Sequence, residues 1–204
     1  MRMRKSITTK VVDRNARLNT ERREVILDAA QLVFDAEGLR NASLRQIAKA
    51  AGCTTGAIYP YFKGKEEIYG ELLRKSLLAL LAYILKQDQQ SATAKERFMG
   101  FARFYIQHPA DFSLGLYLYD QGAPIGVGRN LNSELNRLLL QIIRAVISGD
   151  PEKPGSPEQE ATIFSVLMGL LISHFTDRLS LFGAEIEPLC EKAFISLKQN
   201  GMLS

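Results

Sequence analysis

Hydrophobic residues recur along this chain with the three- and four-residue spacing of α-helices. The clearest stripe comprises Leu131, Leu135, Leu138, Ile142 and Val146. No segment alternates convincingly with the two-residue period of a half-buried β-strand. The pattern therefore predicts an all-α fold of about nine helices.

Capping residues set the expected helix boundaries. Ser43 and Thr93 each stand three residues before a Gln or a Glu, which is the capping-box pattern of a helix start. Thr20 and Ser156 are further N-cap candidates, and Pro109 suits a first helical position. The helix that begins after Thr20 is expected to end at Gly38 and to bury Val25, Ala29, Leu32 and Val33.

Three segments lack a helical pattern. Residues 1–18 have no periodic apolar face and are predicted to form a flexible basic arm. Residues 122–128, with Pro124 inside them, are expected to be a loop. Residues 148–157 are rich in Gly and Pro and are expected to be a linker. We expect domain boundaries after residue 18 and after residue 66, with residues 67–204 forming one larger helical domain.

Charge is distributed unevenly over the 204 residues, whose net charge is +4. Residues 1–75 contain 15 Lys and Arg against 9 Asp and Glu, whereas residues 76–204 contain 11 against 13. This asymmetry favours a polyanionic partner for the N-terminal part, although basic tails also serve solubility alone. Residues 1–18 can add phosphate or minor-groove contacts, or they can be functionally minor.

The composition argues against several other classes of protein. No apolar run approaches the roughly 20 residues that a membrane span needs, and no signal-peptide pattern is present, so we expect a cytoplasmic protein. Cys53 and Cys190 form no metal pattern and are interpreted as small buried thiols. With two His, no nucleophile elbow and no phosphate loop, we expect no enzyme, no cofactor and no metal. An enzyme and an architectural helical protein remain the rival interpretations.

Residues 43–68 carry the most informative pattern. A short capped helix, a glycine turn at Gly52 and a second short helix from Thr54 or Thr55 to Pro60 predict a helix-turn-helix. Ala48 and Ala51 are small enough to let the two helices approach closely. A fourth helix is expected to begin at Gly64–Lys65. In this motif the second helix enters the major groove of DNA while the first crosses the backbone.

This stretch resembles the TetR family of bacterial regulators. The resemblance rests on Ser43-Leu-Arg-Gln-Ile-Ala48, Ala51-Gly52-Cys53, Gly56-Ala-Ile-Tyr59 and the run from Tyr61 to Ile68, Tyr-Phe-Lys-Gly-Lys-Glu-Glu-Ile. Together with the first helix it covers residues 20–68. Pro60 and Tyr61 depart from the residues common in the family, and neither change removes the means of binding DNA. The rest of the chain matches the family only in being helical and of suitable length.

The resemblance implies DNA-binding roles for particular positions. It places nine residues at bases or phosphates: Ser43, Arg45, Thr54, Thr55, Gly56, Ala57, Tyr59, Tyr61 and Lys65. Ser43 and Thr54 can instead be helix caps only, Tyr59 can be packing, and Lys63 and Lys65 can be a solvated face. Few long polar side chains occur between Thr54 and Pro60, so specificity is expected to depend on methyl contacts, water and DNA shape.

In this family the larger domain binds a small molecule and dimerises, which gives two expectations here. An aromatic-rich stretch suggests an apolar pocket lined by Phe101, Tyr105, His108, Phe112, Tyr117 and His174, with ordinary core packing as the alternative. The apolar stripes of the last two helices suggest a four-helix dimer interface through Val166, Leu167, Leu170, Leu189, Ala193, Phe194 and Leu197.

The resemblance thus implies a homodimeric repressor of transcription that binds a palindromic double-stranded DNA operator. A small-molecule effector of unknown identity would release it from DNA by shifting the population between two states. No membrane partner is expected.

Overall fold

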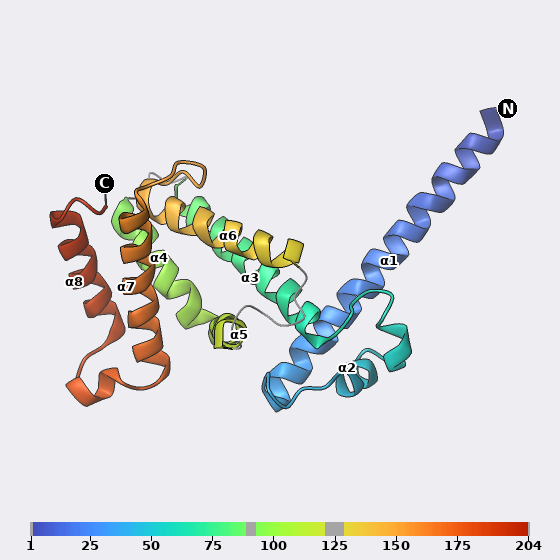
Figure 1. Ribbon diagram of the computed structural model, residues 1–204, viewed down its shortest axis with the longest axis horizontal. Helices are drawn as coiled ribbons and strands as arrows, with labels where there is room; N and C mark the ends of the chain where they lie inside the picture. Colours follow the sequence, from blue (N-terminus) through green and yellow to red (C-terminus); the bar gives the residue numbers. More distant parts are fainter. Residues whose placement is uncertain (1, 89–92, 121–128, 204) are drawn as a thin grey trace. The chain divides into compact units, whose positions relative to one another are not determined.

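The computed structural model describes residues 2–88, 93–120 and 129–203, and all regular elements in these ranges are helical (Figure 1). The all-α prediction is confirmed. The elements are α1 (Arg2–Glu37), α2 (Leu44–Ala50), the 3₁₀ helix η1 (Thr55–Ala57), α3 (Lys65–Asp88), α4 (Ala94–Gln107), α5 (Pro109–Asp120), α6 (Arg129–Ser148), α7 (Pro157–Phe175), the 3₁₀ helix η2 (Leu179–Phe182) and α8 (Ile186–Gln199).

The described residues form two compact units, one ending at Leu72 and the other beginning at Leu73. We call them the N-terminal unit and the larger unit. Helix α3 supplies residues to both. The predicted loop at residues 122–128 lies outside the described residues. No helix in the described part of the chain is long and apolar enough to span a bilayer.

Two predicted helix boundaries in the N-terminal unit are wrong. Helix α1 begins at Arg2 rather than after Thr20, so residues 2–18 are helical. This stretch contains no Gly or Pro, and nothing in its backbone chemistry stops a helix before Thr20. The third predicted helix is reduced to the three-residue η1, which leaves eight α-helices in the described ranges instead of nine.

The buried face of α1 is also shifted from the predicted one. Val25 and Leu32 are 52% and 67% exposed, whereas Ile26, Ala30 and Phe34 are buried. Ala29 and Val33 are buried as predicted. Two apolar stripes overlap on this helix, one residue apart, and the stripe containing Ile26 and Ala30 packs into the core.

Aromatic packing and polar anchors hold the N-terminal unit together. The rings of Phe34 and Tyr69 meet edge to face with centroids 4.3 Å apart, a geometry worth about 0.5–1.5 kcal/mol beyond area burial. The Tyr69 hydroxyl donates to the Leu39 carbonyl. Arg23 pairs with Glu71 at 2.8 Å and places its guanidinium 4.7 Å from the ring centroid of Phe62.

The larger unit is built around α4, which packs against α6, α7 and α8. Several sequence expectations are confirmed here. Thr93 and Glu96 form both bonds of a capping box, and the Ser156 hydroxyl accepts from the Gln159 amide with Pro157 in the first turn. Leu135, Leu138, Ile142 and Val146 form the buried stripe of α6, while Leu131 is half-buried. Arg97, only 7% exposed, donates to the Val146 carbonyl near the end of α6.

Candidate nucleic-acid interface

The turn between α2 and η1 is closed by Gly52, as the sequence predicts. Gly52 has φ +65°, in the left-handed region that favours glycine. Its N–H donates to the Lys49 carbonyl at 3.2 Å, and the Cys53 N–H donates to the Ala48 carbonyl at 2.9 Å. These two bonds form a Schellman motif. The motif reverses the chain direction sharply after α2, so η1 begins beside that helix.

The segment after this turn is held in a tight, non-repeating conformation. The N–H groups of Ala57 and Ile58 donate to the Thr54 and Thr55 carbonyls, each three residues back. Pro60 has no N–H with which to bond Gly56, so an α-helix cannot continue through it. The N–H groups of Tyr61 and Phe62 then both donate to the Ile58 carbonyl. The Thr54 side chain makes no capping hydrogen bond, so the cap-only interpretation of Thr54 lacks support.

Burial within this segment separates anchors from displayed residues. Ile58 and Phe62 are fully buried and fix the segment to the core. The residues between and before them face outward or lie half-buried. Thr54, Gly56, Ala57 and Tyr59 are exposed, and Thr55 and Tyr61 are half-buried. The structure thus brings six of the nine predicted DNA-binding positions together on one short surface, which we call the recognition segment (residues 54–61).

The other predicted positions lie at helix starts. Ser43 caps α2: its hydroxyl accepts from the Gln46 amide at 3.3 Å, and the Gln46 side chain accepts from the Ser43 amide at 3.0 Å. Lys65, half-buried at the start of α3, donates from Nζ to the Ala42 carbonyl at 3.2 Å. Both side chains therefore have structural bonds of their own. Arg45 is exposed on α2.

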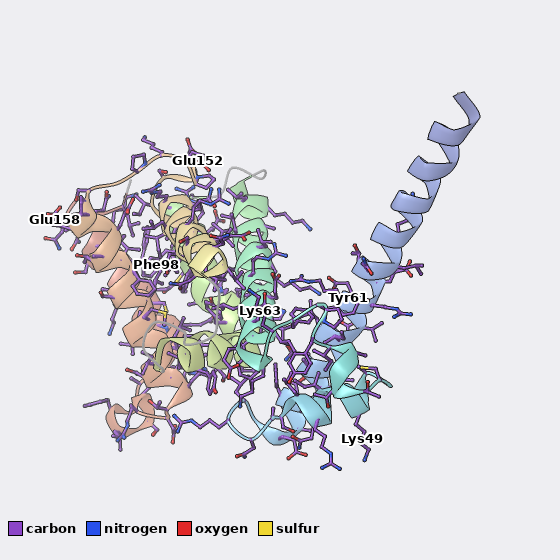
Figure 2. The ribbon with its side chains drawn as sticks, turned by 45° about the vertical axis from the view of Figure 1, so that its right-hand side comes forward. Lys49, Tyr61, Lys63, Phe98, Glu152 and Glu158 are labelled. Carbon is purple, nitrogen blue, oxygen red and sulfur yellow. The ribbon has the colours of Figure 1, made fainter. Side chains whose placement is uncertain are left out.

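A cation that the sequence analysis did not single out lies on the same helix. Lys49 is exposed, four residues after Arg45, and Figure 2 shows its side chain extending away from α2. Residues four apart share one face of a helix, so Arg45 and Lys49 form a small basic face. The i to i+4 spacing of the two cations is the signal that would have identified Lys49.

A groove of about 480 Å³ lies within the N-terminal unit, between α1 and the turn. Leu18 and Val25 line it from α1, and Cys53, Ala57 and Tyr61 line it from the other side. The groove explains why Val25 is exposed, because this side of α1 has no packing partner in the described part of the chain. Cys53 is half-buried, whereas Cys190 is 1% exposed and burial raises the pKa of its thiol to about 11.

Five of the six predicted pocket residues of the larger unit belong to one aromatic group. Ring centroids of Phe101 and Tyr105 lie 5.3 Å apart, those of Tyr105 and Phe112 5.4 Å, and those of Phe112 and Phe175 4.8 Å. His108 stacks on Phe104 and its Nδ1 lies 2.8 Å from the Phe104 carbonyl oxygen. His174 meets Phe175 edge to face at 5.0 Å. Tyr117 is half-buried on α5.

The predicted dimer residues divide into two sets. Leu167, Phe194 and Leu197 are buried within this chain, and the Phe194 ring lies 6.0 Å from that of Phe98 on α4. Their burial is already accounted for by packing inside the chain. Val166, Leu170, Leu189 and Ala193 are half-buried on α7 and α8, which lie side by side (Figure 1). In the described ranges, no three His, Cys, Asp or Glu residues gather as metal ligands.

Comparison with known proteins agrees with this geometry. Residues 26–72 match the family of bacterial regulatory proteins called the tetR family. The transcriptional regulator AcrR of Shigella flexneri is 48% identical over 52 residues, which cover 26% of this chain and 24% of AcrR. The transcriptional repressor KstR2 of Mycobacterium tuberculosis is 37% identical over 89 residues, 44% of each chain. The chain therefore spans less than half the length of these curated relatives.

The fold is shared over a longer stretch. The crystal structure of the transcriptional regulator FadR from Bacillus subtilis in complex with stearoyl-CoA superposes with a TM-score of 0.57 at 22% identity, over 83% of this chain and 94% of FadR. The N-terminal unit is thus a helix-turn-helix domain of the kind found in transcriptional regulators. This domain resembles those of the TetR family of bacterial regulatory proteins.

Proposed function

We propose that this protein is a homodimeric transcriptional repressor that binds a palindromic DNA operator and is released by a small-molecule effector. The observation that carries the proposal is the recognition segment, where exposed residues stand before and between the buried anchors Ile58 and Phe62. A short, firmly anchored segment that presents hydroxyls, methyls and backbone N–H groups suits contact with base edges and phosphates.

The two faces of the motif take different roles in this proposal. Thr54, Thr55, Gly56, Ala57 and Tyr59 contact bases and nearby phosphates, and Tyr61 and Lys65 contact phosphates. Ser43 and Arg45 act at the start of α2, and Lys49 extends the basic face of that helix. Because cations on DNA release counterions, the affinity should fall steeply with salt.

The larger unit supplies the input and the pairing of two chains. FadR, which shares the fold, was crystallised with stearoyl-CoA, and we propose that the aromatic group of α4 and α5 takes a small molecule here. Half-buried Val166, Leu170, Leu189 and Ala193 pair α7 and α8 with the same helices of a second copy. Residues 1–18 are proposed as a basic arm, with domain boundaries after residues 18 and 66. We expect the protein to work in the cytoplasm, without cofactor or catalytic activity.

Fluorescence anisotropy with DNA from upstream of the protein's own gene tests the proposal, with a scrambled duplex as the control. Binding at least about 1,000-fold tighter to one short palindrome than to the scrambled duplex supports a sequence-specific regulator. Equal, salt-steep binding to both duplexes, followed by genome-wide fragment selection that yields no preferred sequence, would instead support a merely cationic DNA-binding protein.

A further inference from the structure

Ser76 is a buried polar residue whose hydroxyl has no partner. It lies on α3 in the larger unit and is 5% exposed. Among the described residues, its Oγ is the one buried side-chain oxygen or nitrogen without a hydrogen bond. Two other helical serines bond the carbonyl four residues back: Ser113 donates to Pro109 and Ser148 to Arg144. Ser76 does not, although a buried, unsatisfied hydroxyl is costly.

The neighbours of α3 indicate where this hydroxyl faces. Leu73, three residues earlier, lies against α5. A methyl group placed on the Cα of Gly115 in α5 would be 3.8 Å from Cδ1 of Leu73, which is van der Waals distance. Tyr83, seven residues later, lies against α4, where its ring centroid is 5.8 Å from that of Phe104. Positions 73, 76, 80 and 83 share one face of a helix. Ser76 therefore lies between the two contacts and faces the corner where α4 ends and α5 begins.

That corner contains the aromatic group described above. Phe104, Tyr105 and Phe112 belong to it, and Phe175 of α7 stacks on Phe112. His108 lies at the corner itself, between Gln107 of α4 and Pro109 of α5. The corner that Ser76 faces is thus rich in aromatic rings, which suit an apolar molecule.

We propose that Ser76 is a hydrogen-bonding contact for the effector, and that the effector is a mainly apolar molecule carrying a neutral hydroxyl, carbonyl or amide group. The inference rests on the proposed function of the larger unit as the effector-binding part. A neutral group suits the rings of Phe104, Tyr105 and Phe112, because these side chains carry no positive charge that could pair with a buried anion. Binding here bonds the ligand to α3, the helix that also carries Lys65 and Tyr69 of the N-terminal unit.

The test is a double-mutant cycle on the full-length protein with 2-naphthol and 2-methylnaphthalene as probes. These fluorescent molecules have similar shapes, and only the first carries a hydroxyl. The wild type and Ser76→Ala are titrated with each, and Ser148→Ala serves as the matched serine control. We expect Ser76→Ala to lower the ratio of 2-naphthol affinity to 2-methylnaphthalene affinity by about 2- to 12-fold, the effect of one neutral hydrogen bond. Ser148→Ala should leave the ratio unchanged.

Thermal unfolding without probe supplies the second readout. A serine whose hydroxyl is unpaired in the free protein should be replaced by alanine without a loss in Tm. An unchanged affinity ratio overturns the role of Ser76. A lower Tm for Ser76→Ala also overturns it, because the loss would show that the Ser76 hydroxyl already bonds a protein group or a water molecule in the free protein. If neither probe binds the wild type, the apolar effector class is wrong. Operator binding by Ser76→Ala without probe stays at the wild-type level, so failure of the DNA-binding proposal is recognised separately.

Discussion

The ammonium group of Lys65 donates a hydrogen bond to the backbone carbonyl of Ala42, 3.2 Å away. Ala42 directly precedes Ser43, the N-cap of α2, and Lys65 is the first residue of α3. One side chain thus joins the starts of two helices that are 23 residues apart in sequence. An ammonium group has three donors, so this bond leaves Lys65 able to reach a phosphate as well.

Replacing Lys65 by Met separates the two roles. The bond to Ala42 is lost, so the free energy of unfolding should fall by about 1 kcal/mol in urea titrations. If Lys65 also neutralises one phosphate, the slope of log affinity against log salt should become shallower by about 0.9. Lys198→Met, at an exposed position on α8, is the control. Unchanged stability would deny the structural role, and an unchanged salt slope would deny the phosphate contact.

Substitutions in the recognition segment should affect DNA binding without affecting the fold. Tyr59 is 56% exposed and Thr55 half-buried, so Tyr59→Ala and Thr55→Ala should leave the unfolding free energy nearly unchanged. Each should weaken operator binding by roughly 1–3 kcal/mol in anisotropy titrations.

The matched comparison is Ile58→Ala, at the fully buried position between them. It should cost about 2–5 kcal/mol of stability through the cavity that it leaves. Wild-type operator affinity in both Tyr59→Ala and Thr55→Ala would remove the recognition role from this segment.

Sequence reasoning succeeded where one local rule acts alone. Thr93 and Ser156 carry complete capping patterns, and both helices begin where those patterns predict. It failed at Val25 and Leu32, because two apolar stripes one residue apart compete and only tertiary packing selects between them. The Lys65 bond and the unpaired Ser76 hydroxyl depend on contacts between separate helices, which spacing along the chain does not encode.

The two cysteines should differ in reactivity. Cys190 is buried and its pKa is raised to about 11, chiefly by burial and further by the carboxylate of Glu187. Its thiol stays protonated at pH 8, and the thiolate is the form that reacts. Cys53 is half-buried and lines the groove beside α1. Iodoacetamide at pH 8 should therefore label Cys53 first, as followed by mass spectrometry.

Raising the pH toward 11 should increase labelling of Cys190, because its thiolate forms only there. Labelling in guanidinium chloride provides the reference, since both thiols are then exposed and should react at similar rates. Equal labelling rates in the native protein at pH 8 would contradict the burial of Cys190.

A charge at Leu170 should separate the proposed dimer. Leu170 is half-buried on α7, whereas Leu167, three residues earlier on the same helix, is fully buried in the core. A carboxylate there would have to lose its water without gaining a partner if two copies pair through this helix. Leu170→Asp should raise the dimer dissociation constant by about 30-fold or more, as a central interface residue does. Multi-angle light scattering over a concentration series measures this change.

The control for that experiment is Leu140→Asp on α6, at a position 43% exposed and outside the proposed interface. It introduces the same charge on a helix and should leave the dimer intact. Circular dichroism should show full helix content in both variants, because neither position is fully buried. If Leu170→Asp forms dimers over the same concentration range as the wild type, the interface does not lie on α7 and α8. Another surface would then have to set the spacing of the two recognition segments on a palindrome.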